Sequence, residues 1–320
     1  MSGLNDTLNQ IEICRTYAER FGRILIVDGR QSGTVGDFGD YFEMDGDGHI
    51  FKMTDATMPD LDAVDCYPPE VRGRVRSVKG RLNPAPGGSG VVDAETGVML
   101  SFPLTQDRPE TLLLHQQWGG GTRSFDLIDR LTIVPEVAAR VRRRISRLPV
   151  GYSALHIRNT DYTTDIGMVL AAIRDKVAGQ DLVLCSDDTS VFPAMRAGLP
   201  DTRIHQITVP VFDGGRAQHS RGRFAGAIVR RRVVVGSIVD LCALAAAKTL
   251  YVPVLQSKII GANVDFTGQN RLSGFSMLAA YLCEDKDRLR RLLGDSGIGL
   301  RPRMKTGKVE VIVAPQAGPV

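Results

Sequence analysis

Apolar side chains recur at helical spacing near the start of the chain. Between Leu8 and Ala18 they return every three or four residues, which predicts an amphipathic helix that ends near Arg20. Asn5 or Asp6 can cap the start of this helix, because short polar side chains accept hydrogen bonds from free backbone N–H groups.

Two apolar runs flank a stretch with little periodicity. Residues 24–27 and residues 111–115 are apolar without alternation, which predicts strands covered on both faces. Residues 31–110 are rich in glycine, proline and aspartate, so we expect short strands and long surface loops there. Pro135 opens a helix that we expect to reach about Arg147.

From residue 150 onward, strand-like and helix-like segments alternate regularly. This alternation predicts a parallel, doubly wound sheet with helices on both faces. The predicted strands are residues 153–157, 182–185, 203–208, 250–252 and 309–313, and the predicted helices are residues 166–178, 189–197, 237–248 and 273–294.

The length of the chain bears on its division into domains. A chain of 320 residues is too long for one ordinary core, so two domains are expected. The predicted fold class is α/β, with two Rossmann-like domains facing a cleft. We place the boundary near Pro149, which gives an N-terminal domain of residues 1–149, a C-terminal domain of residues 150–298 and a tail of residues 299–320.

Composition excludes several classes of protein. Hydrophobic residues make up 43% of the chain and charged residues 24%, which is typical of a globular body rather than a disordered one. No apolar run approaches the roughly 20 residues of a membrane span, and the N-terminus lacks the pattern of a signal peptide. We therefore expect a cytoplasmic protein.

Charge and cysteine content narrow the set of partners. A net charge of +4, spread along the chain, is too diffuse for a nucleic-acid surface. It fits either an ordinary solvated surface or the attraction of a ligand that carries phosphate. The five cysteines form no C-x-x-C pair, so they predict neither zinc nor disulfides.

The sharpest candidate for chemistry is Arg158, which follows the predicted strand 153–157. Ligands bind at the carboxyl ends of parallel strands in open α/β sheets, and a guanidinium group matches phosphate oxygens. Arg158 could therefore neutralise a diphosphate without a metal. A structural salt bridge to Asp161 is an equally good explanation of the spacing.

Two aspartates allow both a functional and a structural interpretation. Asp240 ends the segment Ser237–Asp240, which has the form of a capping box at a helix start. A carboxylate there could instead accept hydrogen bonds from the N1–H and N2 amine of guanine. Asp187 follows the strand 182–185 and could contact a sugar hydroxyl or begin the next helix.

Weaker signals suggest a phosphate site and no metal site. Gly3 precedes a helix start, where backbone N–H groups can approach phosphate. His219 lies in a glycine- and arginine-rich loop, residues 213–226, which could fold over phosphates or be an ordinary surface loop. The D-x-D pairs at residues 45–47 and 60–62 fall in loop-rich stretches, so we interpret them as turns.

Five segments in order carry a resemblance to a known family. Gly3–Asp6 looks like a G-G-x-N element, residues 17–28 like a first helix and strand, and His156–Asp161 like H-x-R-x-x-D. Ser186–Asp188 looks like S/T-D-D, and residues 238–245 like the helix before the last nucleotide-contacting turn. The chain resembles the GDP-fucosyltransferases of the α1,6/α1,2/protein-O superfamily, nearest the rhizobial nodulation type.

The resemblance implies a glycosyltransferase-B architecture and an enzyme. It implies inverting, metal-independent transfer of fucose or a related hexose from a GDP-sugar to a glycan or another hydroxyl acceptor. The GDP-sugar is the co-substrate and no further cofactor is implied. The N-terminal domain would face the acceptor and the C-terminal domain would bind the donor. The expected donor-binding residues are Gly3, Asn5, His156, Asp161, Asp187, Asp240 and Ser257, with Arg158 on the β-phosphate and Asp240 on guanine, together with His219 from the glycine-rich loop.

The sequence departs from the family at positions that matter for catalysis. Tyr162 and Ile166 stand where the α1,6 enzymes carry lysine and glutamate, which leaves Asp165 as the nearest carboxylate and the expected base. In the phosphate turn Pro253–Ser257, Ser257 is the remaining hydroxyl. The alternative is a catalytically inactive GDP-sugar-binding protein, acting as a sensor or subunit.

A third interpretation is an unrelated α/β protein in which Arg158 is structural. It predicts that Arg158 is buried in a salt bridge, away from Asp240 and Gly3.

Overall fold

The structure of the chain is a computed structural model. It describes residues 3–29, 37–44, 60–85, 90–117, 119–211, 226–258, 271–294 and 305–313.

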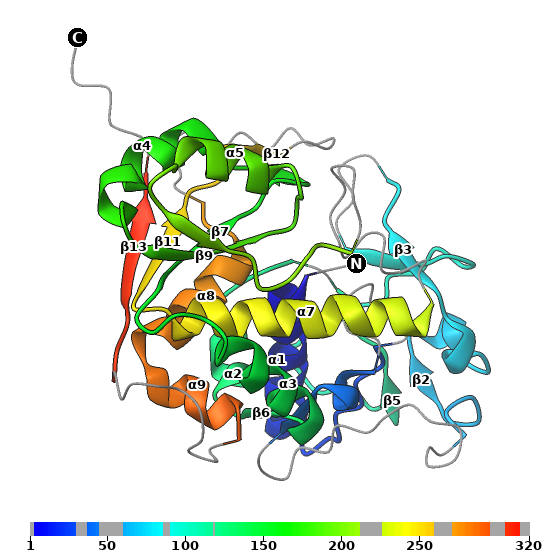
Figure 1. Ribbon diagram of the computed structural model, residues 1–320. Helices are drawn as coiled ribbons and strands as arrows, with labels where there is room; N and C mark the ends of the chain where they lie inside the picture. The colour runs from blue at the N-terminus through cyan, green and yellow to red at the C-terminus, as the bar shows by residue number, and fades with distance from the viewer. Residues whose placement is uncertain are drawn as a thin grey trace.

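A five-stranded parallel sheet forms the centre of the C-terminal half (Figure 1). Its strands are β7 (Ser153–Ile157), β9 (Asp181–Ser186), β10 (Arg203–His205), β11 (Thr249–Pro253) and β13 (Lys308–Ile312). Their spatial order is β10-β9-β7-β11-β13, and all neighbouring pairs are parallel. Every residue of β7 is buried because helices cover both faces of the sheet.

Helices cover the sheet in two layers (Figure 1). On one face, α4 (Ile166–Val177) and α5 (Val191–Gly198) bury Val169, Ile173 and Met195 against the sheet. On the other lie α7 (Ala227–Ala246), α8 (Gly274–Glu284) and α9 (Lys286–Leu292). The predicted α/β class with a parallel sheet is therefore confirmed.

Helices of the N-terminal half pack into the same core as α7 and α8. These helices are α1 (Leu4–Arg20), α2 (Arg123–Ile128) and α3 (Pro135–Ile145). Leu8 of α1 and Val141 of α3 belong to one buried cluster with Leu278 of α8. The position of α1 is thereby fixed by the C-terminal sheet and its helices.

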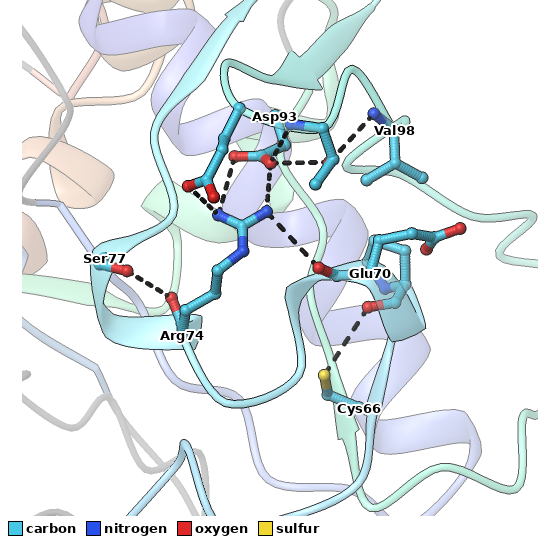
Figure 2. Close-up of polar contacts among 9 residues, drawn as sticks. Cys66, Glu70, Arg74, Ser77, Asp93 and Val98 are labelled. Carbon is cyan, nitrogen blue, oxygen red and sulfur yellow. Dashed lines mark hydrogen bonds and ion pairs between the residues drawn. The ribbon is translucent and has the colours of Figure 1, made fainter.

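A second, smaller core lies between residues 61 and 114. Arg74 forms an ion pair with the carboxylate of Asp93, which is 1% exposed and also accepts the Thr96 backbone N–H at 2.9 Å (Figure 2). Burial alone would raise the pKa of Asp93, but these partners outweigh it and hold the pKa well below its ordinary value. Seven apolar residues are buried beside this pair: Leu61, Cys66, Val71, Val75, Val78, Val91 and Leu100.

The remaining strands form two-stranded pairs. They are β1 (Phe42–Met44) with β6 (Leu131–Ile133), β2 (Cys66–Tyr67) with β5 (Leu112–Leu113), β3 (Gly80–Leu82) with β4 (Val91–Asp93), and β8 (Tyr162–Thr163) with β12 (Ser257–Lys258). Short 3-10 helices occupy Phe38–Asp40, Pro69–Val71 and Val75–Ser77.

Two predicted elements of the N-terminal half differ from the structure. The apolar run 24–27 is not a strand: Ile26 makes a single bridge, and Ile24 is 66% exposed. The run lines a cavity, and this position explains its apolar residues without neighbouring strands on both sides. The predicted strand 111–115 shortens to β5.

Two helix boundaries in the C-terminal half were also wrong. Helix α7 begins at Ala227, so Ser237–Asp240 is not a capping box, and the Ser237 hydroxyl donates to the Val233 carbonyl at 3.1 Å. The predicted helix 273–294 divides at Asp285, whose side chain accepts the Asp287 backbone N–H and starts α9. None of the helices in the described part of the chain has the length and apolar composition that a membrane crossing requires.

Candidate functional site

A cavity of about 870 Å³ lies at the carboxyl ends of four parallel strands. Residues that end or follow those strands line it, namely Arg158 after β7, Asp187 after β9, Gln206 after β10 and Leu255 after β11. In chain order the five strands are arranged 3-2-1-4-5, so the direction of winding reverses beside β7. This reversal is where open α/β sheets form a ligand crevice.

Two helix N-termini also line the cavity. Gly3–Asp6 begin α1, and Ser273–Phe275 begin α8. A Cβ at Gly274 would lie 2.6 Å from the Asn5 Nδ2 atom, so the two helix starts approach closely because residue 274 has no side chain. Neither N-cap residue, Gly3 or Ser273, makes a side-chain capping bond. The positive ends of the two helix dipoles favour an anion here.

Asn5 fixes the start of α1 in place. Its side chain is 3% exposed; Oδ1 accepts the Ser124 hydroxyl at 2.7 Å, and Nδ2 donates to the Gly121 carbonyl at 3.3 Å. Asn5 therefore lines the cavity, while its side-chain amide is bonded to Ser124 of α2 and to Gly121 before it.

Arg158 lies in the cavity wall between two carboxylates. Its Nε donates to Asp161 Oδ1 at 2.9 Å, and its Nη1 lies 3.4 Å from Asp187 Oδ2. Burial alone would lower the pKa of the guanidinium, but these carboxylates outweigh it and raise the pKa. Its side chain stays 19% exposed. The structural interpretation foresaw the salt bridge, but not that Arg158 shares this cavity with Asp240 and Gly3.

The two neighbours of Arg158 are themselves held by hydrogen bonds. Asp187 accepts the Asn159 backbone N–H at 2.8 Å and the Thr160 hydroxyl at 2.5 Å. Asp188, rather than Asp187, accepts the Ser190 N–H before α5. Asp187 therefore holds the turn after β7 in place by hydrogen bonds, and Asp161 orients the guanidinium group of Arg158.

His156 is buried and neutral. The residue is 6% exposed, its Nδ1 lies 2.7 Å from the Ser276 hydroxyl oxygen, and its ring centroid lies 5.0 Å from that of Phe275. Burial and the charge of Arg158 lower the pKa of His156 to about 3. The imidazole can therefore exchange hydrogen bonds in the cavity, but it carries no charge at neutral pH.

Asp240 lies in the middle of α7 and borders the cavity. Both of its carboxylate oxygens lie 2.7 Å from the Thr208 hydroxyl. Burial raises the pKa of Asp240 to about 7, although hydrogen bonds from Thr208 and Cys185 oppose the shift. Its ionised form, whose share grows as the pH rises through about 7, can accept hydrogen bonds from paired N–H donors.

Asp6 is a cavity residue that sequence reasoning missed, because it looked like an ordinary helix cap. It lies in the first turn of α1, and a Cβ at Gly120 would come 2.8 Å from its Oδ1. Burial raises the pKa of Asp6, while the charge of Arg158 opposes the shift. Asp6 is thus a carboxylate within the electrostatic reach of Arg158.

Arginines outnumber acidic groups among the described residues of the lining. Arg140 and Arg144 project from α3 at a spacing of four residues, a pattern readable from the sequence but not recognised as functional. Together the lining carries five arginines and four aspartates, which favours an anionic ligand. The arginines are Arg140, Arg144, Arg158, Arg232 and Arg271, and the aspartates are Asp6, Asp161, Asp187 and Asp240.

Three predicted site residues do not join this group. Asp165 caps α4, accepting the Met168 N–H at 2.9 Å and the Gln256 side chain at 3.0 Å, and it does not line the cavity. Ser257 pairs with Thr163 in a short strand pair and is also absent from the lining. His219 lies outside the described residues. Within the described ranges, His, Cys, Asp and Glu side chains form no group that could hold a metal ion.

The fold and cavity together define an α/β protein with a crevice rich in charged residues at the switch point of a parallel sheet. No protein-family model matches the chain, and no curated protein matches it in sequence.

Comparison with solved structures finds individual proteins with a similar fold. The chain is similar to the fucosyltransferase NodZ from Bradyrhizobium, with 15% identity, a TM-score of 0.51, and coverage of 87% of this chain and 89% of that chain. It is also similar to POFUT1 in complex with GDP, with 12% identity, a TM-score of 0.51, and coverage of 96% and 94%. The expected likeness to the fucosyltransferase superfamily is confirmed at the level of the fold.

Proposed function

We propose that this protein is a glycosyltransferase that moves fucose or a related hexose from a GDP-sugar to a hydroxyl acceptor. The observation that carries the proposal is the meeting of Arg158, two helix N-termini and Asp240 in one cavity at the sheet's switch point. The shared fold with POFUT1, whose crystal structure contains GDP, supports guanosine diphosphate as the nucleotide.

The donor fits the cavity in a defined orientation. The diphosphate lies against Arg158 and the first turns of α1 and α8, where backbone N–H groups and positive charge are concentrated. Guanine lies toward Asp240, which accepts hydrogen bonds from its N1–H and N2 amine. Residues 150–298 form most of the donor side of a glycosyltransferase-B cleft, to which the start of α1 and the arginines of α3 contribute, and the rest of residues 1–149 form the acceptor side.

The proposed transfer is a single displacement with inversion. The bond between the anomeric carbon and the β-phosphate oxygen breaks, and its electron pair stays on GDP, where Arg158 stabilises the new charge. The acceptor hydroxyl attacks from the opposite face and forms the new glycosidic bond. The lining arginines supply the positive charge, so the proposed transfer needs no metal.

Asp6 is the best placed of the cavity's carboxylates to take the proton of the acceptor hydroxyl. It borders the cavity near Arg158, whereas Asp165 caps a helix outside the lining. A raised pKa brings a carboxylate closer to the value that suits a base at neutral pH. We therefore assign the base to Asp6 in place of Asp165.

The test is release of GDP from GDP-fucose by the purified chain in the presence of EDTA, with GDP-mannose in parallel to compare hexoses. We expect slow hydrolysis by the wild type. Arg158→Lys should lower its rate by about 100-fold or more, because a single ammonium cannot replace the guanidinium fork. A folded protein that binds GDP-fucose but releases no GDP would contradict the proposed transfer and favour a sugar-nucleotide-binding subunit.

A further inference from the structure

Arg144 of α3 lines the cavity at the carboxyl ends of the strands, the charged cavity. It is exposed, and its Nη1 donates to the Ile207 carbonyl at 3.1 Å. Among the described residues its guanidinium makes this one hydrogen bond and no ion pair, whereas Arg158 lies between two carboxylates. The bond to Ile207 therefore fixes the guanidinium, and the parallel N–H donors of Nε and Nη2 stay available for a ligand.

One short segment after β10 connects Arg144 with Asp240. Ile207, which accepts the hydrogen bond from Arg144, directly precedes Thr208. The Thr208 hydroxyl lies 2.7 Å from both carboxylate oxygens of Asp240. All four residues line the cavity. A free donor fork and a hydrogen-bond acceptor are thus held beside the same two residues of this segment.

Packing between α3 and α7 fixes the two helices that carry these side chains. Ile145, which follows Arg144, is buried in the main core. Val239, which precedes Asp240, is buried in the same core. Because a close-packed core resists displacement, the backbone positions of Arg144 and Asp240 are fixed relative to each other before a ligand binds.

Guanine offers donors and acceptors on adjoining edges. Its N1–H and N2 amine are donors, whereas O6, beside N1, and N7, beside O6, are acceptors. The planar fork of an arginine matches O6 and N7 together, which is the commonest specific contact between arginine and guanine. An arginine beside the carboxylate that accepts from N1–H is therefore placed to meet the acceptor edge.

We propose that Arg144 binds the O6 and N7 atoms of guanine while Asp240 accepts from N1–H and the N2 amine. This inference rests on the proposed function for the presence of GDP and names the residue that recognises the second edge of the base. Arg144 then selects the nucleotide, and Arg158 holds the diphosphate.

Two analogues of GDP test the two edges separately. In 7-deaza-GDP a C–H group replaces N7, and inosine diphosphate lacks the N2 amine. The affinities of the three nucleotides are measured by calorimetric titration. We expect the wild type to bind each analogue about tenfold or more weakly than GDP, because each analogue loses a hydrogen bond to a charged group.

Variants of α3 assign the N7 preference to one side chain. Arg144→Met removes the guanidinium and should bind GDP and 7-deaza-GDP equally, while it still binds inosine diphosphate about tenfold more weakly than GDP. Arg144→Lys keeps the charge without the fork and should also lose the preference over 7-deaza-GDP. Arg140→Met is the matched control, one helical turn earlier in the same lining, and should keep both preferences.

The outcomes separate this inference from the function on which it rests. Equal binding of GDP and 7-deaza-GDP by the wild type would overturn the inference and leave GDP as the nucleotide. A preference over 7-deaza-GDP that persists in Arg144→Met would also overturn it, since Arg144 would then contact another part of the nucleotide. Failure of the folded wild type to bind GDP would overturn the proposed function, and this inference with it.

Discussion

Two cavities lie along α1, and they differ in the residues that line them and in the part of the fold that holds those residues. The charged cavity collects arginines and aspartates at the ends of a five-stranded sheet, with α1 and α8 anchored in the main core. A second cavity, of about 680 Å³, is lined mainly by apolar residues of α1, of the run 24–27, of residues 111–114 and of the small core, and it is called the apolar cavity. The charged cavity thus depends on the main sheet and its helices, whereas the apolar cavity depends partly on the small core, which can be altered separately.

The largest expected effect is on the reaction rate rather than on binding, and it comes from Asp6 in the wall of the charged cavity. Asp6→Asn should lower kcat by about 100-fold to 10,000-fold, the usual contribution of a general base, with GDP affinity changed little. Because burial raises the pKa of Asp6, the wild-type rate should fall as pH drops through a value above that of an ordinary aspartate. Asp6→Asn should lose this acidic limb.

The control is Asp126→Asn, which removes an exposed carboxylate on α2 outside both linings and should change neither rate nor profile. An Asp6→Asn enzyme with wild-type kcat would return the role of base to another group.

The next effect is on stability and belongs to the small core between residues 61 and 114. Asp93→Asn leaves Arg74 without its buried partner, so the free energy of unfolding of the small core should fall by roughly 3–5 kcal/mol. GDP affinity should stay within about twofold, because Asp93 lies outside the charged cavity. Urea denaturation and nucleotide titration of the same sample measure the two quantities.

The pH dependence of this pair has a defined sign. The pKa of Asp93 is lower in the folded chain than in the unfolded one, so the folded state binds fewer protons and the pair stabilises above the unfolded pKa. That stability is lost as pH falls below about 4. Asp93→Asn should therefore show less acid sensitivity, and an unchanged acid limb would contradict the assignment.

The smallest effect concerns selectivity within the charged cavity. Asp240→Asn should weaken GDP binding by about 10-fold to 100-fold while ADP binding changes little, because guanine alone offers paired donors to a carboxylate. Since burial raises the pKa of Asp240 to about 7, its ionised fraction grows between pH 6 and 8, and GDP affinity should rise with it.

Protonation of the GDP phosphates also changes the affinity with pH. The same titrations on Asp240→Asn measure that change alone, so the difference between the two proteins gives the contribution of Asp240. If the variant keeps both the selectivity and the rise with pH, Asp240 does not recognise guanine.

The apolar pattern within each segment was sufficient to predict several strands and helices of the main sheet. β7, α4 and β9 were predictable because each is fully specified by its own apolar spacing. The start of α7 was missed because β-branched Val233–Val235 lower helix propensity, and their burial against the core overrides it.

Site residues that end a strand could be predicted from the sequence. Site residues that come together only through folding could not. Arg158 and Asp187 could be found because parallel strands end at one edge. Asp6 could not be assigned, since only folding brings it near Arg158. The apolar run 24–27 signalled burial, but sequence alone could not separate a strand from a cavity wall.

Calorimetric titration of GDP, with ADP and UDP as controls, tests the central claim most directly. It is made without metal on the wild type and on Arg158→Ala, with melting temperatures to confirm that both are folded. We predict selective binding of GDP by the wild type, weakened by about 100-fold or more in the variant. Absence of GDP binding to the folded wild type, or equal affinity in Arg158→Ala, would contradict the account.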